Sequence, residues 1–126
     1  MTVVLDASAL LALMNDEPGA ISVKEALPEA VISAVNLAEV VTKLVDGGMP
    51  AAQIFNDLGE LNLSDVPFDV QRALATGLLR AATRSSGLSL GDRACLSLAL
   101  QLACPVITSD RAWTQLDLGV DVRLAR

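Results

Sequence analysis

Four acidic residues stand beside the places where a strand-like run gives way to a helix-like run. Asp6 and Asp110 each come at the end of a short apolar run, and Glu39 and Asp92 lie near the start of helical patterns. Carboxylate oxygens gathered at one place are the ligands that Mg²⁺ and Mn²⁺ prefer in proteins. The residue types therefore predict a divalent-metal site in which all four acids are both metal ligands and catalytic residues.

Residues that would support several other chemistries are missing. The sequence contains no histidine and no tyrosine, which excludes a histidine general base, a Ser-His-Asp triad and a zinc site with histidine ligands. Cys95 and Cys104 are nine residues apart, a spacing that fits neither a zinc knuckle nor a redox motif. We expect both to be small buried residues of a cytoplasmic protein.

Size and composition set further bounds. A chain of 126 residues without repeats or linkers predicts a single domain over residues 1–126. The hydrophobic fraction of 52% is slightly above the usual range for soluble domains, and the excess predicts apolar surface buried in a homodimer. No apolar run is long enough to cross a membrane. The net charge of −6 opposes non-specific binding of nucleic acid, because a phosphate backbone attracts basic surfaces.

Short apolar strands alternate with helical patterns along the whole chain. Strands are predicted at residues 3–5, 30–33, 63–66, 105–108 and 120–124, and helices at residues 7–14, 20–27, 34–46, 50–61, 69–85, 89–103 and 110–116. The helix over 69–85 carries an apolar face made of Val70, Leu74, Leu78 and Ala81. This alternation is typical of a three-layer α/β fold, in which right-handed crossovers build a mostly parallel sheet covered by helices on both faces.

Each acid also has a purely structural interpretation. Asp6, Asp92 and Asp110 can cap the helices that follow them. For Asp6, however, Ser8 is available as an alternative cap. Glu39 can form an exposed ion pair with the lysine one turn further along, worth roughly 0.2–0.5 kcal/mol. Taken one at a time, the acids do not decide between these interpretations and a metal site.

The joint placement of the acids favours the metal site. In a parallel sheet the loops that follow the strands emerge at one edge, so acids far apart in the sequence converge there. Carboxylates close together raise one another's pKa, and a bound dication removes that cost. Gly91, next to Asp92, costs about 1 kcal/mol inside a helix, which indicates that another group approaches the backbone closely at this point.

Four segments, LDASALLAL, SAVNLAEVV, LSLGDRACLSLAL and TSDRAW, resemble the signature segments of PIN-domain ribonucleases and, among these, the VapC-type toxins of bacterial toxin–antitoxin systems. The resemblance covers nearly the whole chain and is weakest between Gly48 and Ala82. It implies a five-stranded parallel sheet flanked by helices and an endoribonuclease that hydrolyses RNA, such as tRNA or rRNA, with water activated by Mg²⁺ or Mn²⁺. It also implies a homodimer that a VapB-type antitoxin silences by occupying the active-site groove.

The resemblance gives the acids and their neighbours individual roles. Asp6, Glu39 and Asp92 match the family's principal metal-binding acids, and Asp110 matches its more variable fourth. The residues that match supporting hydroxyls near that site are Ser8, Thr108 and Ser109.

Two arginines are candidates for binding substrate. Arg93 and Arg111 each directly follow one of the acids and could contact a substrate phosphate. Solvated charges, or partners of neighbouring acids, are equally good interpretations of both.

Two other function classes compete with a ribonuclease. A phosphatase-like metal hydrolase of the aspartate-nucleophile kind usually carries Asp-x-Asp after its first strand, where this chain has Asp6-Ala7-Ser8. In a catalytically silent, acidic α/β interaction module the acids would only cap helices, so neutralising them would destabilise the fold. A metal site predicts instead that Asp6→Asn and Asp92→Asn raise the melting temperature of the metal-free protein, because like charges repel.

Overall fold

A parallel sheet of five strands, in the order β3-β2-β1-β4-β5, runs through the middle of the protein. The computed structural model describes all residues from 1 to 126. The strands are β1 (Val3–Leu5), β2 (Ala30–Ser33), β3 (Ser64–Val66), β4 (Val106–Thr108) and β5 (Val122–Leu124). Every neighbouring pair of strands is parallel, so the predicted α/β class and the predicted parallel sheet are confirmed.

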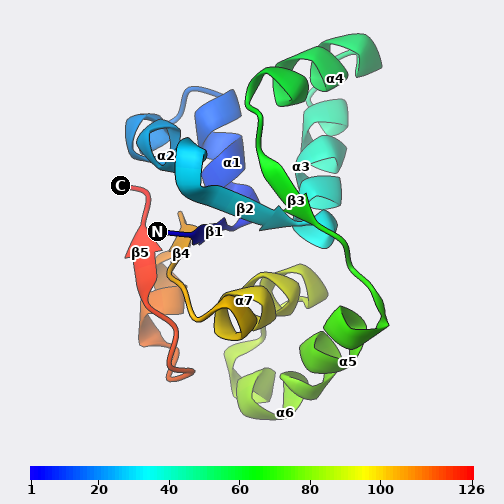
Figure 1. Ribbon diagram of the computed structural model, residues 1–126. Coiled ribbons are helices and arrows are strands. Elements are labelled where there is room, and N and C mark those ends of the chain that lie inside the picture. Colours follow the sequence, from blue (N-terminus) through cyan, green and yellow to red (C-terminus); the bar gives the residue numbers. More distant parts are fainter.

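Helices form a layer on each side of this sheet, with α1 to α4 on one side and α5 to α7 on the other (Figure 1). The α-helices are α1 (Ala7–Met14), α2 (Ala20–Ala26), α3 (Ala34–Asp46), α4 (Ala51–Glu60), α5 (Val70–Leu78), α6 (Arg80–Thr83) and α7 (Leu90–Leu102). Three 3₁₀ helices complete the fold: η1 (Leu27–Glu29), η2 (Arg84–Ser86) and η3 (Arg111–Gln115). None of the helices combines the length and the apolar character needed to span a lipid bilayer.

Side chains of successive residues in β1 pack on opposite faces of the sheet. Val3 and Leu5 belong to the core cluster beneath α1 and α2, whereas Val4 belongs to the cluster that α7 covers. All three side chains are buried, as expected for a central parallel strand with helices on both faces. The buried strand therefore fixes the position of the Asp6 backbone, which follows it directly.

One predicted helix differs in length and in orientation. Residues 69–85 form α5, α6 and η2 instead of one continuous helix, and Gly77 in the last turn of α5 weakens helical continuity there. The predicted apolar face is real but points outward: Val70, Leu74 and Leu78 are 73%, 62% and 79% exposed, and Ala81 is also exposed. Periodicity identifies such a face but does not say which neighbour covers it.

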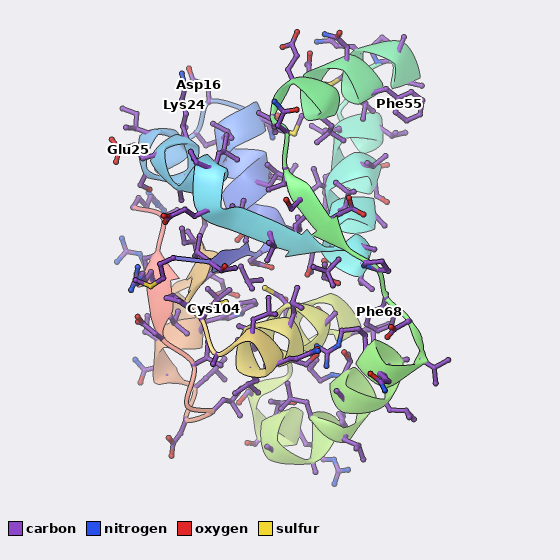
Figure 2. All side chains as sticks on the ribbon, in the orientation of Figure 1. Asp16, Lys24, Glu25, Phe55, Phe68 and Cys104 are labelled. Atoms are coloured by element: carbon purple, nitrogen blue, oxygen red, sulfur yellow. The ribbon has the colours of Figure 1, made fainter.

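The two cysteines are free. Cys95 lies in the core and Cys104 is half-buried, on the segment that leads from α7 into β4 (Figure 2). Among the aromatic residues, Phe55 is 72% exposed on α4 and points away from the rest of the protein in Figure 2. Trp113 is the aromatic residue that packs into the core.

Three neighbouring strands lead to one edge of the sheet. β1 pairs with both β2 and β4, so α1, α3 and the segment before η3 all begin next to one another. Helix α7 packs against β1, β2 and α3 and adds its own first turn. The fold thus brings together the parts of the chain that carry the predicted acids.

Candidate active site

Asp6 occupies the junction between β1 and α1 and is 6% exposed. It is the N-cap residue of α1, yet its side chain makes no capping hydrogen bond. Its Oδ2 instead accepts hydrogen bonds from Ser8 Oγ at 2.7 Å and from Thr108 Oγ1 at 2.9 Å. Capping therefore does not explain this aspartate, which the end of β4 holds in place across 102 residues of sequence.

The environment of Asp6 disfavours its ionised form. Burial raises the pKa of the Asp6 carboxyl, and the negative charge of Asp92 raises this pKa further. The hydrogen bonds from Ser8 and Thr108 lower it, because they stabilise the carboxylate. A cation placed beside Asp6 would remove the main cost of keeping it charged.

The predicted hydroxyl residues tie the ends of β1 and β4 together. Ser8 Oγ accepts a hydrogen bond from the Ser109 backbone N–H at 3.0 Å, and Thr108 Oγ1 accepts one from the Asp110 N–H at 3.0 Å. Ser8 and Thr108 thus contact Asp6 directly, while Ser109 contributes its backbone. The Ser109 hydroxyl is buried and has no hydrogen-bond partner.

Glu39 projects from α3 and is held by Asn36, one turn earlier. Asn36 Nδ2 donates to Glu39 Oε1 at 2.8 Å and to the Gly91 carbonyl at 2.9 Å. Asn36 is fully buried, and its Oδ1 has no partner. No ion pair links Glu39 to Lys43, so the exposed ion pair considered from the sequence does not form.

Asn36 holds Glu39 in place through contacts that the sequence did not reveal. Its spacing places it on the same helix face as Glu39, but its second contact, Gly91, lies 55 residues further along the chain. The only signal in the sequence was an amide three residues before an acid.

Gly91 lets the Glu39 carboxylate lie directly against the backbone of α7. A side chain at this position would start inside the volume of that carboxylate, in collision with both of its oxygens. The prediction that another group approaches the backbone at Gly91 is therefore confirmed, and Glu39 is that group.

Asp92 and Asp110 do act as caps. Asp92 forms a capping box with Ser89, since its Oδ2 accepts from the Ser89 N–H at 3.0 Å and its own N–H donates to Ser89 Oγ at 3.1 Å. Asp110 Oδ1 accepts from the Ala112 N–H at 3.0 Å and caps η3. In each residue one carboxylate oxygen remains outside the capping bond.

The negative charges of three of the acids act on the buried thiol of Cys95. This thiol is fully buried, and burial raises its pKa well above the ordinary range, with further increases from the charges of Asp6, Asp92 and Glu39. These acids therefore share one electrostatic neighbourhood, with Asp110 nearby at the end of β4. No group of three or more acidic or thiol side chains is drawn together tightly enough to hold a metal ion.

The residues present suit an oxygen-liganded divalent cation in type. The donors are carboxylates, and the unpartnered Oδ1 of Asn36 adds a buried acceptor beside Glu39. Hard cations such as Mg²⁺ prefer such oxygen ligands.

The amino-acid sequence matches a known protein family over most of its length. The family model of the PIN domain matches residues 3–118. This chain belongs to the PIN domain family. None of the curated proteins matches the chain in sequence.

Solved structures of low sequence identity share the PIN fold. The DNA-bound VapBC complex from Salmonella typhimurium contains a chain that matches with a TM-score of 0.77 and 18% identity, over 100% of this chain and 99% of that chain. VapBC-1 from nontypeable Haemophilus influenzae matches with a TM-score of 0.75 and 21% identity, over 99% and 98%. VapBC-5 from Mycobacterium tuberculosis, described as a toxin–antitoxin system, matches with a TM-score of 0.61 and 23% identity, over 100% and 99%.

The two arginines beside the acids of this PIN domain differ in surroundings. Arg93 Nη1 donates to the Thr76 carbonyl on α5 at 3.1 Å, and Arg93 Nε is buried without a partner. Arg111 is exposed at the start of η3. Neither arginine forms an ion pair, and their contact with substrate stays a prediction.

Two cavities adjoin the acidic edge, that is, the carboxyl edge of the sheet that carries Asp6, Glu39, Asp92 and Asp110. Ser109 lines one of them and Asp110 lines the other. One, of about 350 Å³, is lined by residues that include Ser8, Ser109 and Arg126. The other, of about 320 Å³, is lined by residues that include Asp92 and Asp110.

Proposed function

We propose that this PIN domain is an endoribonuclease that depends on Mg²⁺ or Mn²⁺ and acts as the toxin of a toxin–antitoxin pair. The observation that carries the proposal is the carboxyl edge of the sheet, where buried Asp6 accepts hydrogen bonds from Ser8 and Thr108 and Glu39 lies against the α7 backbone at Gly91, next to Asp92. Their elements begin at the carboxyl edge of a parallel sheet, where open α/β folds bind ligands. An RNA substrate in the cytoplasm and a VapC-type role agree with the fold shared with the VapBC structures.

In this proposal Asp6, Glu39 and Asp92 hold the ion, and Asp110 assists from the rim. When bound, the ion makes a water molecule nucleophilic near neutral pH and neutralises charge on the phosphate that is attacked. Asp6 keeps its orientation through Ser8 and Thr108. Cleavage would leave a 3′-hydroxyl on one product and a 5′-phosphate on the other.

The test of this function is RNA cleavage by the purified protein. We expect single-stranded RNA to be cut in the presence of Mg²⁺ or Mn²⁺, to stay intact in EDTA, and to be cut again when excess Mg²⁺ is restored. The sequencing of RNA ends after induced expression in cells would identify the target, such as a tRNA or rRNA. Undiminished cleavage in EDTA would contradict the proposed mechanism.

We infer that a VapB-type antitoxin is the protein partner. Two solved structures that share this fold are a toxin–antitoxin complex from Klebsiella pneumoniae and VapBC-5, a member of the VapBC family of toxin–antitoxin systems. An antitoxin segment that enters the acidic edge would block substrate there. Co-expression with the cognate antitoxin should suppress RNA cleavage, and a full rate in a stable complex would contradict this partner.

We also infer a homodimer that forms through α5. Val70, Leu74 and Leu78 are spaced four residues apart and form one exposed apolar stripe, a kind of surface that marks interaction sites. Leu74→Glu should convert a dimer into a monomer in sizing experiments at micromolar concentration, whereas Ile21→Glu, at an exposed apolar position on α2, should not. A dimer that persists in Leu74→Glu, or a monomeric wild type, would contradict this interface.

A catalytically silent interaction module is the second candidate function, because Asp92 and Asp110 do cap helices. In such a module, substitution of the acids would change neither metal binding nor RNA cleavage. The phosphatase-like hydrolase has no such support, since the position two residues after Asp6 is Ser8. The melting temperature and the RNA cleavage activity of Asp6→Asn distinguish the interaction module from the nuclease.

A further inference from the structure

The cavity of about 320 Å³ beside the acidic edge has walls of two kinds. Its apolar walls come from Leu88, Trp113 and Leu116, and its polar groups include Asp92, Asp110 and Gln115. Leu88 and Trp113 are 7% and 1% exposed and belong to the core, so this side is rigid. Gln115 is exposed at the end of η3, and its amide makes only a long hydrogen bond, from Nε2 to Thr114 Oγ1 at 3.5 Å.

These walls define which part of an RNA chain can enter. A phosphate group is disfavoured, since both charged residues among the lining groups named above are acids. A flat group with apolar faces and hydrogen-bond donors on its edge fits both kinds of wall, as small-molecule sites are mostly apolar with a few placed polar groups. A nucleobase that carries an exocyclic amine has these properties, and single-stranded RNA presents unstacked bases of this kind to proteins.

The position of the cavity connects it to the proposed site. Asp92 and Asp110 belong both to the acidic edge and to the cavity lining. Asp110 also follows directly after Ser109, whose N–H bonds Ser8 beside Asp6. A base in the cavity and a phosphate at Asp6 would therefore belong to adjacent positions of one nucleotide chain.

We propose that this cavity is a specificity subsite for the base next to the bond that is cut, in which Gln115 and Asp110 select bases with an exocyclic amine. This inference rests on the proposed ribonuclease function. Asp110 uses Oδ1 to cap η3, so Oδ2 can accept a hydrogen bond from the amine. Gln115 offers an amide donor and acceptor to the same base edge. Adenine, cytosine and guanine each carry one exocyclic amine, whereas uracil carries carbonyl oxygens at both of its exocyclic positions and offers the carboxylate no exocyclic donor.

Trp113 provides a direct readout, because it is the single tryptophan of the chain and lines the cavity. The full-length protein in EDTA would be titrated with AMP, CMP, GMP and UMP while tryptophan fluorescence is recorded. We expect the three amine-bearing nucleotides to change the fluorescence at concentrations about tenfold lower than UMP does, the size of effect that a well-placed base contact produces.

Two glutamine variants make the test specific. Gln115→Ala should reduce the difference between amine-bearing nucleotides and UMP to less than about threefold. Gln53→Ala removes an equally exposed glutamine on the remote helix α4 and should keep the wild-type difference. Equal responses to all nucleotides, no response at all, or an unchanged preference in Gln115→Ala would overturn the subsite.

Cleavage of short RNAs that differ only at the base beside the cut separates this inference from the function on which it rests. With Mg²⁺, the wild type should prefer an amine-bearing base at one position, and Gln115→Ala should lose this preference. RNA cleavage without a preference that depends on Gln115 would overturn the subsite alone. Selective fluorescence changes without any RNA cleavage would contradict the proposed function, while the base-binding cavity would stand.

Discussion

Asp6→Asn should lower metal-dependent RNA cleavage by at least about 100-fold, since even residues outside the first ligand shell cost 10- to 100-fold. The same substitution should raise the melting temperature of the metal-free protein. An asparagine oxygen can still accept the hydrogen bonds from Ser8 and Thr108. The buried negative charge, however, is removed, and with it the repulsion from Asp92. A combined loss of activity and gain in stability is the signature of a ligand residue.

The stability gain should depend on pH in a defined direction. The folded protein raises the pKa of Asp6 above its ordinary value of 3.8, so the wild type loses stability as pH rises through the raised pKa. Each pKa unit of the shift costs about 1.4 kcal/mol. The wild type and Asp6→Asn should thus unfold at similar temperatures below pH 3.8. At neutral pH the melting temperature of the variant should be higher by roughly 3–6 °C for each pKa unit of the shift.

Thermal unfolding in EDTA from pH 3 to pH 8 would measure this difference, with Asp117→Asn, an exposed aspartate, as the matched control that should show no gain. A lower melting temperature for Asp6→Asn at neutral pH would favour the silent interaction module. The capping box changes the expectation for Asp92→Asn, because the loss of a charged cap offsets the relief of repulsion.

Gly91→Ala should disturb the proposed site more than it disturbs folding. The new methyl group would collide with the Glu39 carboxylate, which can rotate away because it is the end of a flexible side chain. The rotation breaks its hydrogen bond with Asn36, and this loss of about 1 kcal/mol offsets most of the gain of about 1 kcal/mol that alanine normally brings to a helix. Displaced from Gly91, Glu39 would also lose its orientation by Asn36, so RNA cleavage should fall at least about tenfold.

The matched control is Gly59→Ala, in a helix where an added methyl group meets nothing within 4 Å. This variant should be more stable than the wild type by about 0.5–1 kcal/mol and should cleave RNA at the wild-type rate. Urea unfolding and cleavage assays of both variants would test the contrast. A Gly91→Ala protein that is stabilised as much as Gly59→Ala would show that Glu39 does not need this close approach.

The sheet and its carboxyl edge could be predicted from the sequence, because local hydrophobic periodicity and turn residues mark where its strands and helices lie. The strand before Asp6 and the helix after it, for example, lie where the apolar pattern places them. Gly91 was also informative, because a glycine inside an apolar helix is unfavourable unless something requires it. Such features are encoded by a few adjacent residues.

Contacts between distant segments could not be predicted. Whether Asp6 caps α1 or faces the edge depends on Thr108, which donates to it from another strand. The apolar stripe on α5 points outward because the opposite side of that helix packs against α7. There Thr76 of α5 and Ser97 of α7 share a hydrogen bond. The separations among the acids depend in the same way on packing between layers.

The most direct test of the central claim is equilibrium binding of Mn²⁺, followed by calorimetry or electron paramagnetic resonance. The wild type should bind Mn²⁺ saturably and gain thermal stability as the ion concentration rises, by about 2.7 kcal/mol at 100 times the Kd. Asp6→Asn and Glu39→Gln should each weaken binding at least about tenfold, while Asp117→Asn should not. Binding that is absent in the wild type, or unchanged in both Asp6→Asn and Glu39→Gln, would contradict the claim that these acids form a metal site.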